Sequence, residues 1–284
     1  KLFEPNKCKI MNLELKDANE YLKIGQREKF VQTWWNAQTY TPAGIINLAD
    51  LGRSLYEETH NQTCPYPWPK LNEKTYGMRT GELLTFTSGA GMGKSSIMRE
   101  LMYHLMHNTE ENIGVLAVFD HFGSMDNDEI LNRVRYMAKA LNTKWIILDH
   151  LSILVSGQED NGDERKSIDI LMTKLRSLVE ETQIGLLLVS HLRRPAGDRG
   201  HEDGREITLS HLRGSASIAH LSDAVLALER NQQAEDEVEA NTTTVRILKN
   251  RYTGETGIAC YLHYGSNTGR MTQVDNPFME DEDE

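Results

Sequence analysis

The residues that could do chemistry begin with a glycine-rich stretch, Ser88 to Ser95, which reads S-G-A-G-M-G-K-S after the apolar run 83–87. Glycines let the backbone bend so that several N–H groups face one anion. The ammonium of Lys94 suits the β- and γ-phosphates, and the Ser95 hydroxyl suits Mg²⁺. The helix expected next directs its positive N-terminus at the same anion. The stretch therefore predicts a nucleoside triphosphate site.

The stretch departs from the general phosphate-loop pattern at one position. The general phosphate-loop pattern is G-x-x-x-x-G-K-[ST], and Ser88 stands where its first glycine belongs. The alternative is an ordinary glycine-rich turn, but strand, loop, Lys-Ser and helix follow in the required order, which favours the phosphate loop. The predicted nucleotide contacts are Ser88, Gly89, Ala90, Gly91, Met92, Gly93, Lys94, Ser95 and Ser96.

Polar residues also end two further apolar strands. Asp149 ends the run 145–149, where a carboxylate in such proteins holds magnesium opposite the serine hydroxyl. The alternative is an Asp that caps the next helix. His191 follows the run 186–190 and would face the γ-phosphate, because ligands bind at the carboxyl ends of parallel strands. A lone histidine is usually structural, so only the fold context favours His191.

Arg251 is the third kind of candidate. Its guanidinium stays protonated and can fork onto phosphate oxygens. An arginine lent to a neighbour's γ-phosphate raises a phosphoryl-transfer rate by about 10³–10⁵. The alternative is a surface cation near a sheet edge.

Composition bounds the class of protein. The chain has 284 residues, 39% of them hydrophobic, and a net charge of −11, which fits a soluble globular protein. No apolar run is long enough to span a bilayer. Cys8, Cys64 and Cys260 form no C-x-x-C pair, which excludes a zinc ribbon and favours a reducing compartment. The acidic balance speaks against general nucleic-acid binding, although DNA responds to local charge.

The core alternates strands and helices, which indicates an α/β domain with a parallel sheet covered on both faces. We predict strands at 82–87, 113–118, 145–149, 184–190, 224–229, 243–249 and 257–264, and helices at 95–107, 127–141 and 164–182. Upstream we expect a strand at 8–15, a polar turn at 16–20, helices at 26–36 and 48–59, and an extended proline-rich connector at 61–70.

Several blocks together resemble a known family. They are T-S-G-A-G-M-G-K-S at 87–95, I-I-L-D-H-L-S-I at 146–153, D-E-R-K-S-I-D-I-L-M-T-K-L at 163–175, L-R-G-S at 212–215, L-S-D-A-V-L-A-L-E-R-N-Q-Q at 221–233 and V-R-I-L-K-N-R-Y-T-G-E-T-G-I-A at 245–259. The chain resembles the ring-shaped replicative helicases of the DnaB class, in particular the helicase half of the primase–helicases of T-seven-like bacteriophages, with mitochondrial Twinkle more distant.

The resemblance implies an α/β fold: a RecA-like P-loop NTPase core with a mostly parallel sheet, preceded by a linker helix and a remnant of the primase (Toprim) domain. Residues 1–24 would be the Toprim remnant, 25–62 the linker with its subunit-docking helix, 63–279 the helicase domain and 280–284 an acidic tail. Primase activity is not expected. The tail is read as a solvated end or as a docking segment for a basic partner, for which the family suggests a replicative polymerase.

Roles carry over to matching positions. Lys94 and Ser95 would bind phosphate and Mg²⁺, Asp149 would hold the metal, and His191 would sense the γ-phosphate. Arg251, with Lys249 beside it, would act on the neighbouring subunit's nucleotide, either ATP or dTTP. Base and sugar would contact Arg230 and Tyr264, and the DNA loops 192–206 and 212–216 would contribute Arg193, Arg194, Arg213, Gly214 and Ser215.

One departure concerns catalysis. After the strand at 113–118 the family carries a glutamate that activates water, and then several dozen residues; here Phe119 follows Val118 directly. Either the protein carries a segment that the sequence omits, or it has lost one. We expect the first, because a direct join would disrupt the sheet. Without the glutamate, hydrolysis is in question while nucleotide binding survives.

The leading hypothesis is a hexameric DNA helicase of the (host) cytoplasm that hydrolyses a triphosphate at subunit interfaces and moves 5′-to-3′ on single-stranded DNA, with no membrane association. The first alternative is a RecA-like strand-exchange ATPase, which would form filaments. The second is a nucleotide-binding scaffold without hydrolysis.

Overall fold

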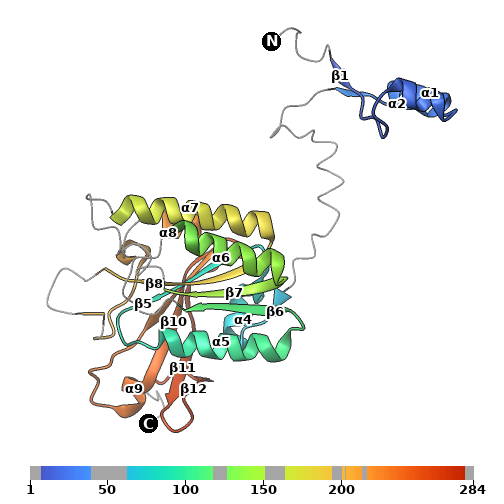
Figure 1. The fold of residues 1–284 in the computed structure, drawn as a ribbon. Helices are drawn as coiled ribbons and strands as arrows, with labels where there is room; N and C mark the ends of the chain where they lie inside the picture. Colours follow the sequence, from blue (N-terminus) through green and yellow to red (C-terminus); the bar gives the residue numbers. More distant parts are fainter. Residues whose placement is uncertain are drawn as a thin grey trace. The chain divides into compact units, whose positions relative to one another are not determined.

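The computed structural model describes residues 8–39, 63–117, 127–150, 164–193, 200–201, 203–212 and 216–278. The chain divides into two compact units, Lys1–His60 and Asn61–Glu284 (Figure 1). The helix expected at 48–59 and the acidic tail lie outside the described residues.

The described part of the first unit, residues 8–39, consists of two short strands and two helices. β1 (Lys9–Ile10) pairs antiparallel with β2 (Gln38–Thr39). α1 (Ala18–Lys23) and α2 (Arg27–Trp35) stand between them, and α2 confirms the helix expected at 26–36. The polar turn expected at 16–20 is wrong, because Asp17 caps α1 by accepting from the backbone N–H groups of Asn19 and Glu20. The strand expected at 8–15 shrinks to two residues.

The second unit is built on one sheet of eight strands, in the order β12-β11-β10-β9-β5-β8-β7-β6. The five strands from β9 to β6 run parallel, and β10, β11 and β12 continue as an antiparallel meander. Their bounds are β5 Leu83–Ser88, β6 Asn112–Ala117, β7 Thr143–Asp149, β8 Gly185–His191, β9 Ala224–Glu229, β10 Thr242–Asn250, β11 Gly257–Gly265 and β12 Arg270–Val274. All seven predicted strands are confirmed, and β12 was missed.

Helices cover both faces of this sheet, with α6 (Asn127–Ala140) and α7 (Glu164–Thr182) on one face and α5 (Lys94–Asn108) on the other (Figure 1). Alternate residues of β7 show why: Ile146 and Leu148 belong to one apolar cluster, and Trp145 and Ile147 to the other. A strand buried on both faces reads as a continuous apolar run, which explains why the strands could be found in the sequence. Two short helices, α8 (Ala216–Leu221) and α9 (Glu237–Asn241), flank β9 and β10.

The proline-rich stretch at 61–70 is only partly the extended connector that we expected. β3 (Thr63–Cys64) pairs with β4 (Met78–Arg79), and Pro69 starts a helix, α4 (Pro69–Thr75). Proline fits the first helical position because its missing N–H would have no partner there. The buried Trp68 donates its indole N–H to Met271 O at 2.9 Å, so this stretch packs onto the core.

The region around Val118 gives the main correction. β6 and β7 are neighbours, pair in parallel over six residues, and are separated in the chain by α6. This is an ordinary strand–helix–strand crossover. The expectation that a direct join at 118/119 would disrupt the sheet is therefore wrong. The residues 118–126 themselves lie outside the described part.

Candidate functional site

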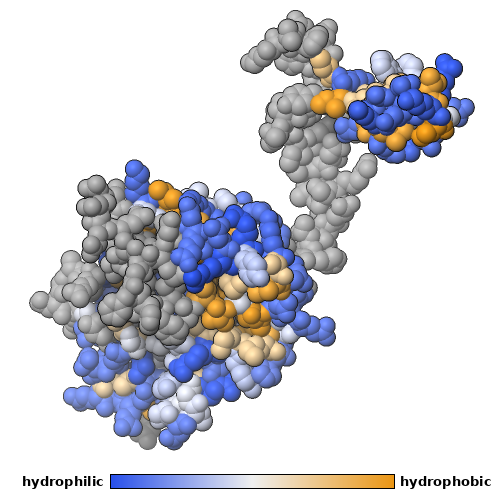
Figure 2. Space-filling model, viewed as in Figure 1, coloured by the Kyte–Doolittle hydropathy of each residue, from blue (hydrophilic) through white to orange (hydrophobic). Residues whose placement is uncertain are grey.

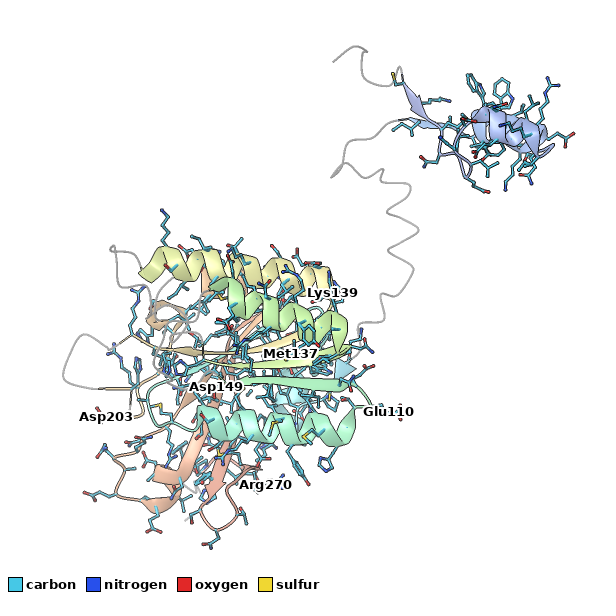
Figure 3. The ribbon with its side chains drawn as sticks, in the orientation of Figure 1. Glu110, Met137, Lys139, Asp149, Asp203 and Arg270 are labelled. Atoms are coloured by element: carbon cyan, nitrogen blue, oxygen red, sulfur yellow. The ribbon has the colours of Figure 1, made fainter. Side chains whose placement is uncertain are left out.

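Three parallel strands bring the phosphate loop, Asp149 and His191 to one end of the sheet. In the register of β5 and β8, Ser88 lies beside His191, while β7 ends at Asp149 two strands away from β5. Figure 3 shows Asp149 and Asp203 toward this end, and Glu110, which precedes β6, toward the other. The carboxyl end of the sheet is where open α/β folds bind ligands.

The phosphate loop has the backbone that its glycines predict. Gly91 and Gly93 have φ of 72° and 89°, a region that favours glycine. Ala90 and Gly91 are exposed, whereas the Met92 side chain is fully buried and can serve a ligand only through its backbone. Ser96 accepts from Arg99 Nη2 at 3.1 Å on the first turn of α5.

Lys94 lies over this loop. Its Nζ donates to Gly89 O at 2.6 Å, to Ser88 O at 3.1 Å and to the Ser88 hydroxyl at 3.1 Å. Burial lowers the pKa of Lys94 from 10.5 to about 8, and Asp149 opposes that shift. The hydroxyl of Ser88 thus gives the lysine a partner that the glycine of the general pattern lacks.

Ser95 and Asp149 face each other across the site, with the Ser95 hydroxyl 3.4 Å from Asp149 Oδ2. A hydroxyl and a carboxylate are oxygen donors of the kind that Mg²⁺ prefers. Their placement fits the predicted metal role. Among the described residues there is no cluster of three or more His, Cys, Asp or Glu side chains that could hold a metal without help from a ligand or water.

His191 does not stand alone. Its ring packs edge-on against the ring of His150, with centroids 4.3 Å apart. Because His150 directly follows Asp149, this contact joins the ends of β7 and β8. A change in His191 can therefore reach the residue beside the carboxylate.

The two predicted DNA loops meet where the first begins and the second begins, at residues 192–193 and 211–212, which we call the root of the DNA loops. Leu192 and Leu212 form an antiparallel bridge, and Arg193 N donates to His211 O at 2.8 Å. Arg193 is exposed at the start of the first loop. Arg194, Arg213, Gly214 and Ser215 lie outside the described residues, so their placement stays a prediction.

Arg251 and Lys249 lie at the opposite, amino end of the parallel strands. Arg251 N donates to Asp223 O, and Asp223 N donates to Leu83 O, at the first residue of β5. From Leu83 to Ser88 the strand spans about 16 Å at 3.3 Å per residue. Arg251 therefore cannot reach the phosphate loop of its own chain.

Both side chains are held there. The Arg251 guanidinium donates to Asp223 Oδ1 at 3.2 Å and remains 56% exposed. Lys249 Nζ donates to three backbone carbonyls at the end of α8, those of Ala219, His220 and Ser222. Burial lowers the pKa of Lys249, with Arg251 adding to the shift.

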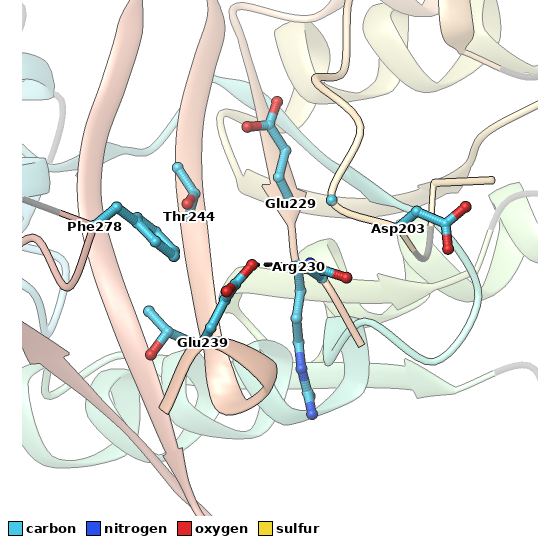
Figure 4. A pocket seen from close by; sticks show the side chains of 9 residues that line it. Asp203, Glu229, Arg230, Glu239, Thr244 and Phe278 are labelled. Carbon is cyan, nitrogen blue, oxygen red and sulfur yellow. Dashed lines mark hydrogen bonds between the residues drawn. The ribbon is translucent and has the colours of Figure 1, made fainter. Parts of the chain in front are cut away.

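Arg230 lies in a pocket of about 230 Å³ next to β9 and β10 (Figure 4). The lining residues are Asp203, Gly204, Glu229, Arg230, Asn231, Glu239, Thr242, Thr244 and Phe278. The guanidinium donates to Ala240 O and, at 3.2 Å, to Asn241 Oδ1. Burial lowers the pKa of Arg230 and Tyr264 opposes this, so the two predicted base-contacting residues influence each other.

Sequence reasoning missed two residues. Gln232 Nε2 donates to Gly91 O at 2.8 Å, which places it directly on the phosphate loop. Asp223 is buried and accepts from Leu83 N at 2.9 Å, from Arg176 and from Arg251. Both residues lie in the block 221–233. Their roles could not be predicted from the sequence of that block, because their partners on β5, the phosphate loop and α7 lie 47 or more residues away in the chain.

The fold and site together define a P-loop nucleotide-binding protein with a RecA-like core. A solved ATPase domain superimposes with a TM-score of 0.64 at 17% identity, covering 82% of this chain and all of that domain. A DnaB-like replicative helicase solved to show its interactions with primase gives 0.60 at 14% identity, covering 90% of this chain and 73% of that one. These likenesses confirm the predicted core fold; the linker helix and Toprim remnant stay predictions.

A family model described as the DnaB-like helicase C terminal domain matches residues 115–273, and the chain belongs to that family. The DNA helicase/primase of Enterobacteria phage T3 is 31% identical over 318 residues, covering 93% of this chain and 56% of that protein. The replicative DNA helicase DnaB of Mycoplasma genitalium is 22% identical, covering 75% of this chain and 57% of that protein. The chain thus spans little more than half the length of these relatives.

The phage match is longer than the chain itself, 318 aligned positions against 284 residues. The relative therefore carries residues inside the matched region that this chain lacks.

Proposed function

We propose that this chain is the motor part of a replicative DNA helicase, in which triphosphate hydrolysis between subunits of a ring moves single-stranded DNA 5′-to-3′ and separates a duplex. One observation carries the proposal. The phosphate loop and the root of both DNA loops lie at the carboxyl end of the sheet, while Arg251 lies about 16 Å away at the amino end. Such a chain needs a second copy to complete its site.

Nucleotide binding would rest on Lys94, the backbone of 88–93 and the N-terminus of α5. Bound magnesium would neutralise phosphate charge, held by Ser95 and Asp149. Lys94 would give up its bonds to Ser88 and Gly89 for phosphate oxygens, which are stronger acceptors than carbonyls. Arg230 and Tyr264 would border the base and sugar of ATP or dTTP.

Arg251 would act on the nucleotide of the adjacent subunit, with Lys249 fixing the backbone beside it. The guanidinium is half exposed and its partner Asp223 also holds Arg176, so Asp223 keeps a counter-charge when Arg251 leaves. A guanidinium is planar and permanently charged, so it can donate two hydrogen bonds to the oxygens of the transferred phosphoryl group and stabilise their negative charge. His191, packed on His150 beside Asp149, would report the γ-phosphate to the strand end.

DNA would run along the loops 192–206 and 212–216, through Arg193, Arg194, Arg213, Gly214 and Ser215. Each phosphate contact should lower the slope of log affinity against log salt by about 0.7–0.9. A ring of six copies would surround the strand. None of the described helices is long and apolar enough to cross a bilayer. We place the protein in the cytoplasm, of the host if a phage encodes it, with a polymerase as the proposed partner of the acidic tail 280–284.

The parts outside the motor follow the family. Residues 1–24 would belong to a Toprim domain and 25–62 to the linker that docks on the next subunit, leaving 63–279 as the helicase domain. In the first unit Trp34 and Trp35 are 61% and 77% exposed, which supports a larger domain or partner around it.

The missing glutamate bears on hydrolysis. β6 ends at Ala117 with no carboxylate, and it is the outer strand of the sheet in the described part of the chain. Apolar side chains are exposed on this strand and beside it: Val115 is 46% exposed, and Leu141, whose carbonyl accepts from Asn112 at the start of β6, is 51% exposed. Figure 2 shows hydrophobic surface on this face of the second unit. An open edge with apolar flanks normally is covered. We infer that the intact protein carries further residues between Val118 and Phe119, with the glutamate among them.

The proposal is tested by mixing two inactive variants of the intact protein, which carries the segment inferred after Val118. Lys94→Ala removes the nucleotide site and Arg251→Ala removes the donated arginine. Mixed rings contain interfaces with an intact Lys94 facing an intact Arg251, so single-stranded-DNA-stimulated hydrolysis should reappear on mixing. No recovery, with both variants assembled, would contradict action between subunits. Wild type that hydrolyses no faster than Lys94→Ala would favour the scaffold, and filaments in place of rings in electron micrographs would favour strand exchange.

A further inference from the structure

His201 lies where the first DNA loop returns to the core. Its side chain is 4% exposed. Around it, Asp203 forms a bridge with Asn231, and Ile207 N donates to Glu229 Oε1 at 2.7 Å. The returning segment is thus fixed alongside the end of β9, on the side of the sheet that carries Asp149 (Figure 3). None of the roles described above uses this histidine.

The backbone of the phosphate loop touches His201 directly. A Cβ placed on Gly89 would lie 2.9 Å from the Cβ of His201, closer than such atoms approach in proteins. Gly89 is buried, and its φ does not require glycine. Glycine is needed here because His201 occupies the space. The second residue of the phosphate loop therefore cannot move toward the DNA loop without displacing His201.

The other side of the imidazole is tied to the root of the DNA loops. Nε2–H donates to Arg193 O at 3.2 Å, and Arg193 N donates to His211 O, next to the bridge at Leu212. The His201 ring also lies 5.3 Å from the His211 ring. Nδ1 of His201 is buried, and no described residue donates to it. The imidazole thus contacts the phosphate loop on one side and the start of the DNA loop on the other.

We propose that His201 is a positioning residue that couples nucleotide binding to DNA binding, by transmitting the position of Gly89 to the common root of the two DNA loops. The proposal rests on the proposed function. Close-packed groups respond to a displacement as a unit and do not absorb it. Phosphate binding changes the position of the backbone at Gly89, and His201 moves with it because the two are in contact. The hydrogen bond from His201 Nε2 to Arg193 O then displaces the start of the DNA loop that contains Arg193.

The test measures a coupling factor in the full chain. The affinity for a fluorescent oligothymidylate is determined with and without a saturating non-hydrolysable ATP or dTTP analogue, and the ratio is α. By linkage the oligonucleotide must change the analogue's affinity by the same factor. Wild type is expected to give an α of about 5–150. His201→Ala should bring α to within about twofold of 1, with each ligand alone bound as in wild type to within about threefold.

Two further variants sharpen the result. His201→Gln keeps volume and an N–H donor for Arg193 O, so it should restore part of α even if His201→Ala unfolds the loop. His104→Ala is the matched control, since it also removes a histidine with a buried ring nitrogen, but from α5, where it lies near Pro65 and outside the phosphate loop and the DNA loops; α should stay at the wild-type value.

An unchanged α in His201→Ala, or an equal loss in His104→Ala, overturns the inference. A wild-type chain that binds both ligands with an α of 1 overturns the inference alone. A chain that binds no oligonucleotide under any condition removes the proposed function, and the inference with it.

Discussion

At the carboxyl end of the parallel sheet the charged side chains contact few groups of opposite charge, whereas at the amino end they form ion pairs with one another. Lys94 donates only to neutral oxygens, and Ser95 and Asp149 stand 3.4 Å apart. At the amino end the carboxylate of Asp223 holds Arg176, Arg251 and the N–H of Leu83 at once. The first end keeps its charges available for a ligand. The second uses a buried carboxylate to fix an arginine in place.

The difference predicts how substitutions at the two ends act. Groups kept available for a ligand contribute little to folding and can even oppose it. Groups tied into a buried network contribute to folding and to function together. Substitutions at the carboxyl end should therefore change activity more than stability, and substitutions in the network around Asp223 should change stability.

The largest effect is expected from Arg251→Ala. The rate of DNA-stimulated hydrolysis should fall by about 10³–10⁵ while nucleotide affinity stays unchanged, because the guanidinium stabilises transferring charge and not the bound ground state. Single-turnover kinetics and equilibrium nucleotide binding separate the two quantities. Arg270→Ala is the matched control: Arg270 is 53% exposed and also pairs with a buried carboxylate, that of Glu100. A similar rate loss in both variants would show that the effect is not specific to Arg251.

The next effect concerns stability at the amino end. Asp223→Ala leaves the guanidinium of Arg176 (19% exposed) without its buried partner and Leu83 N without an acceptor. Such a loss costs about 2–4 kcal/mol, toward the lower part of the range for buried pairs because Arg176 keeps some contact with water. Urea unfolding measures it. Arg251→Ala, which removes only a half-exposed partner, should cost less than about 1 kcal/mol. Equal losses would mean that Asp223 does not organise this end.

The carboxyl end could be found from the sequence because its signals are local. Strand, glycine loop, Lys94 and Ser95 are contiguous, and Asp149 and His191 each end an apolar run. Strands buried on both faces are continuous apolar segments, so their positions in the chain and the α/β class could be predicted. The sequence also predicted the family that the comparisons confirm.

The amino end could not be found this way. Asp223, Arg176 and Leu83 meet only through the sheet register, and a single sequence carries no trace of register between distant strands. The same holds for His201 against Gly89. Capping caused the error at Asp17, since a polar run reads as a turn when the short helix after it has no clear periodicity. Pro69 misled in a similar way, because a proline that breaks a helix interior can begin one.

The smallest effect tests whether the phosphate-loop lysine opposes folding. With a pKa of about 8 in the folded chain and 10.5 as its ordinary value, Lys94 releases its proton in the folded state before it does so in the unfolded state. The free energy of unfolding should therefore rise between about pH 8 and pH 10.5 and carry no slope from this group below pH 8. Lys94→Met removes the buried charge, so the variant should be more stable than wild type by about 1–3 kcal/mol at pH 7.

The advantage of Lys94→Met should shrink as the pH approaches about 10, where the wild-type lysine is neutral in the folded chain. Urea unfolding of both proteins at several pH values measures this difference without the background of other titrating groups. Lys70→Met is the control, because the hydrogen bond to Asp275 raises the pKa of Lys70, so its removal should give no gain at pH 7. A stability difference for Lys94→Met that grew with pH would contradict the picture of a charge held ready for phosphate at the expense of the fold.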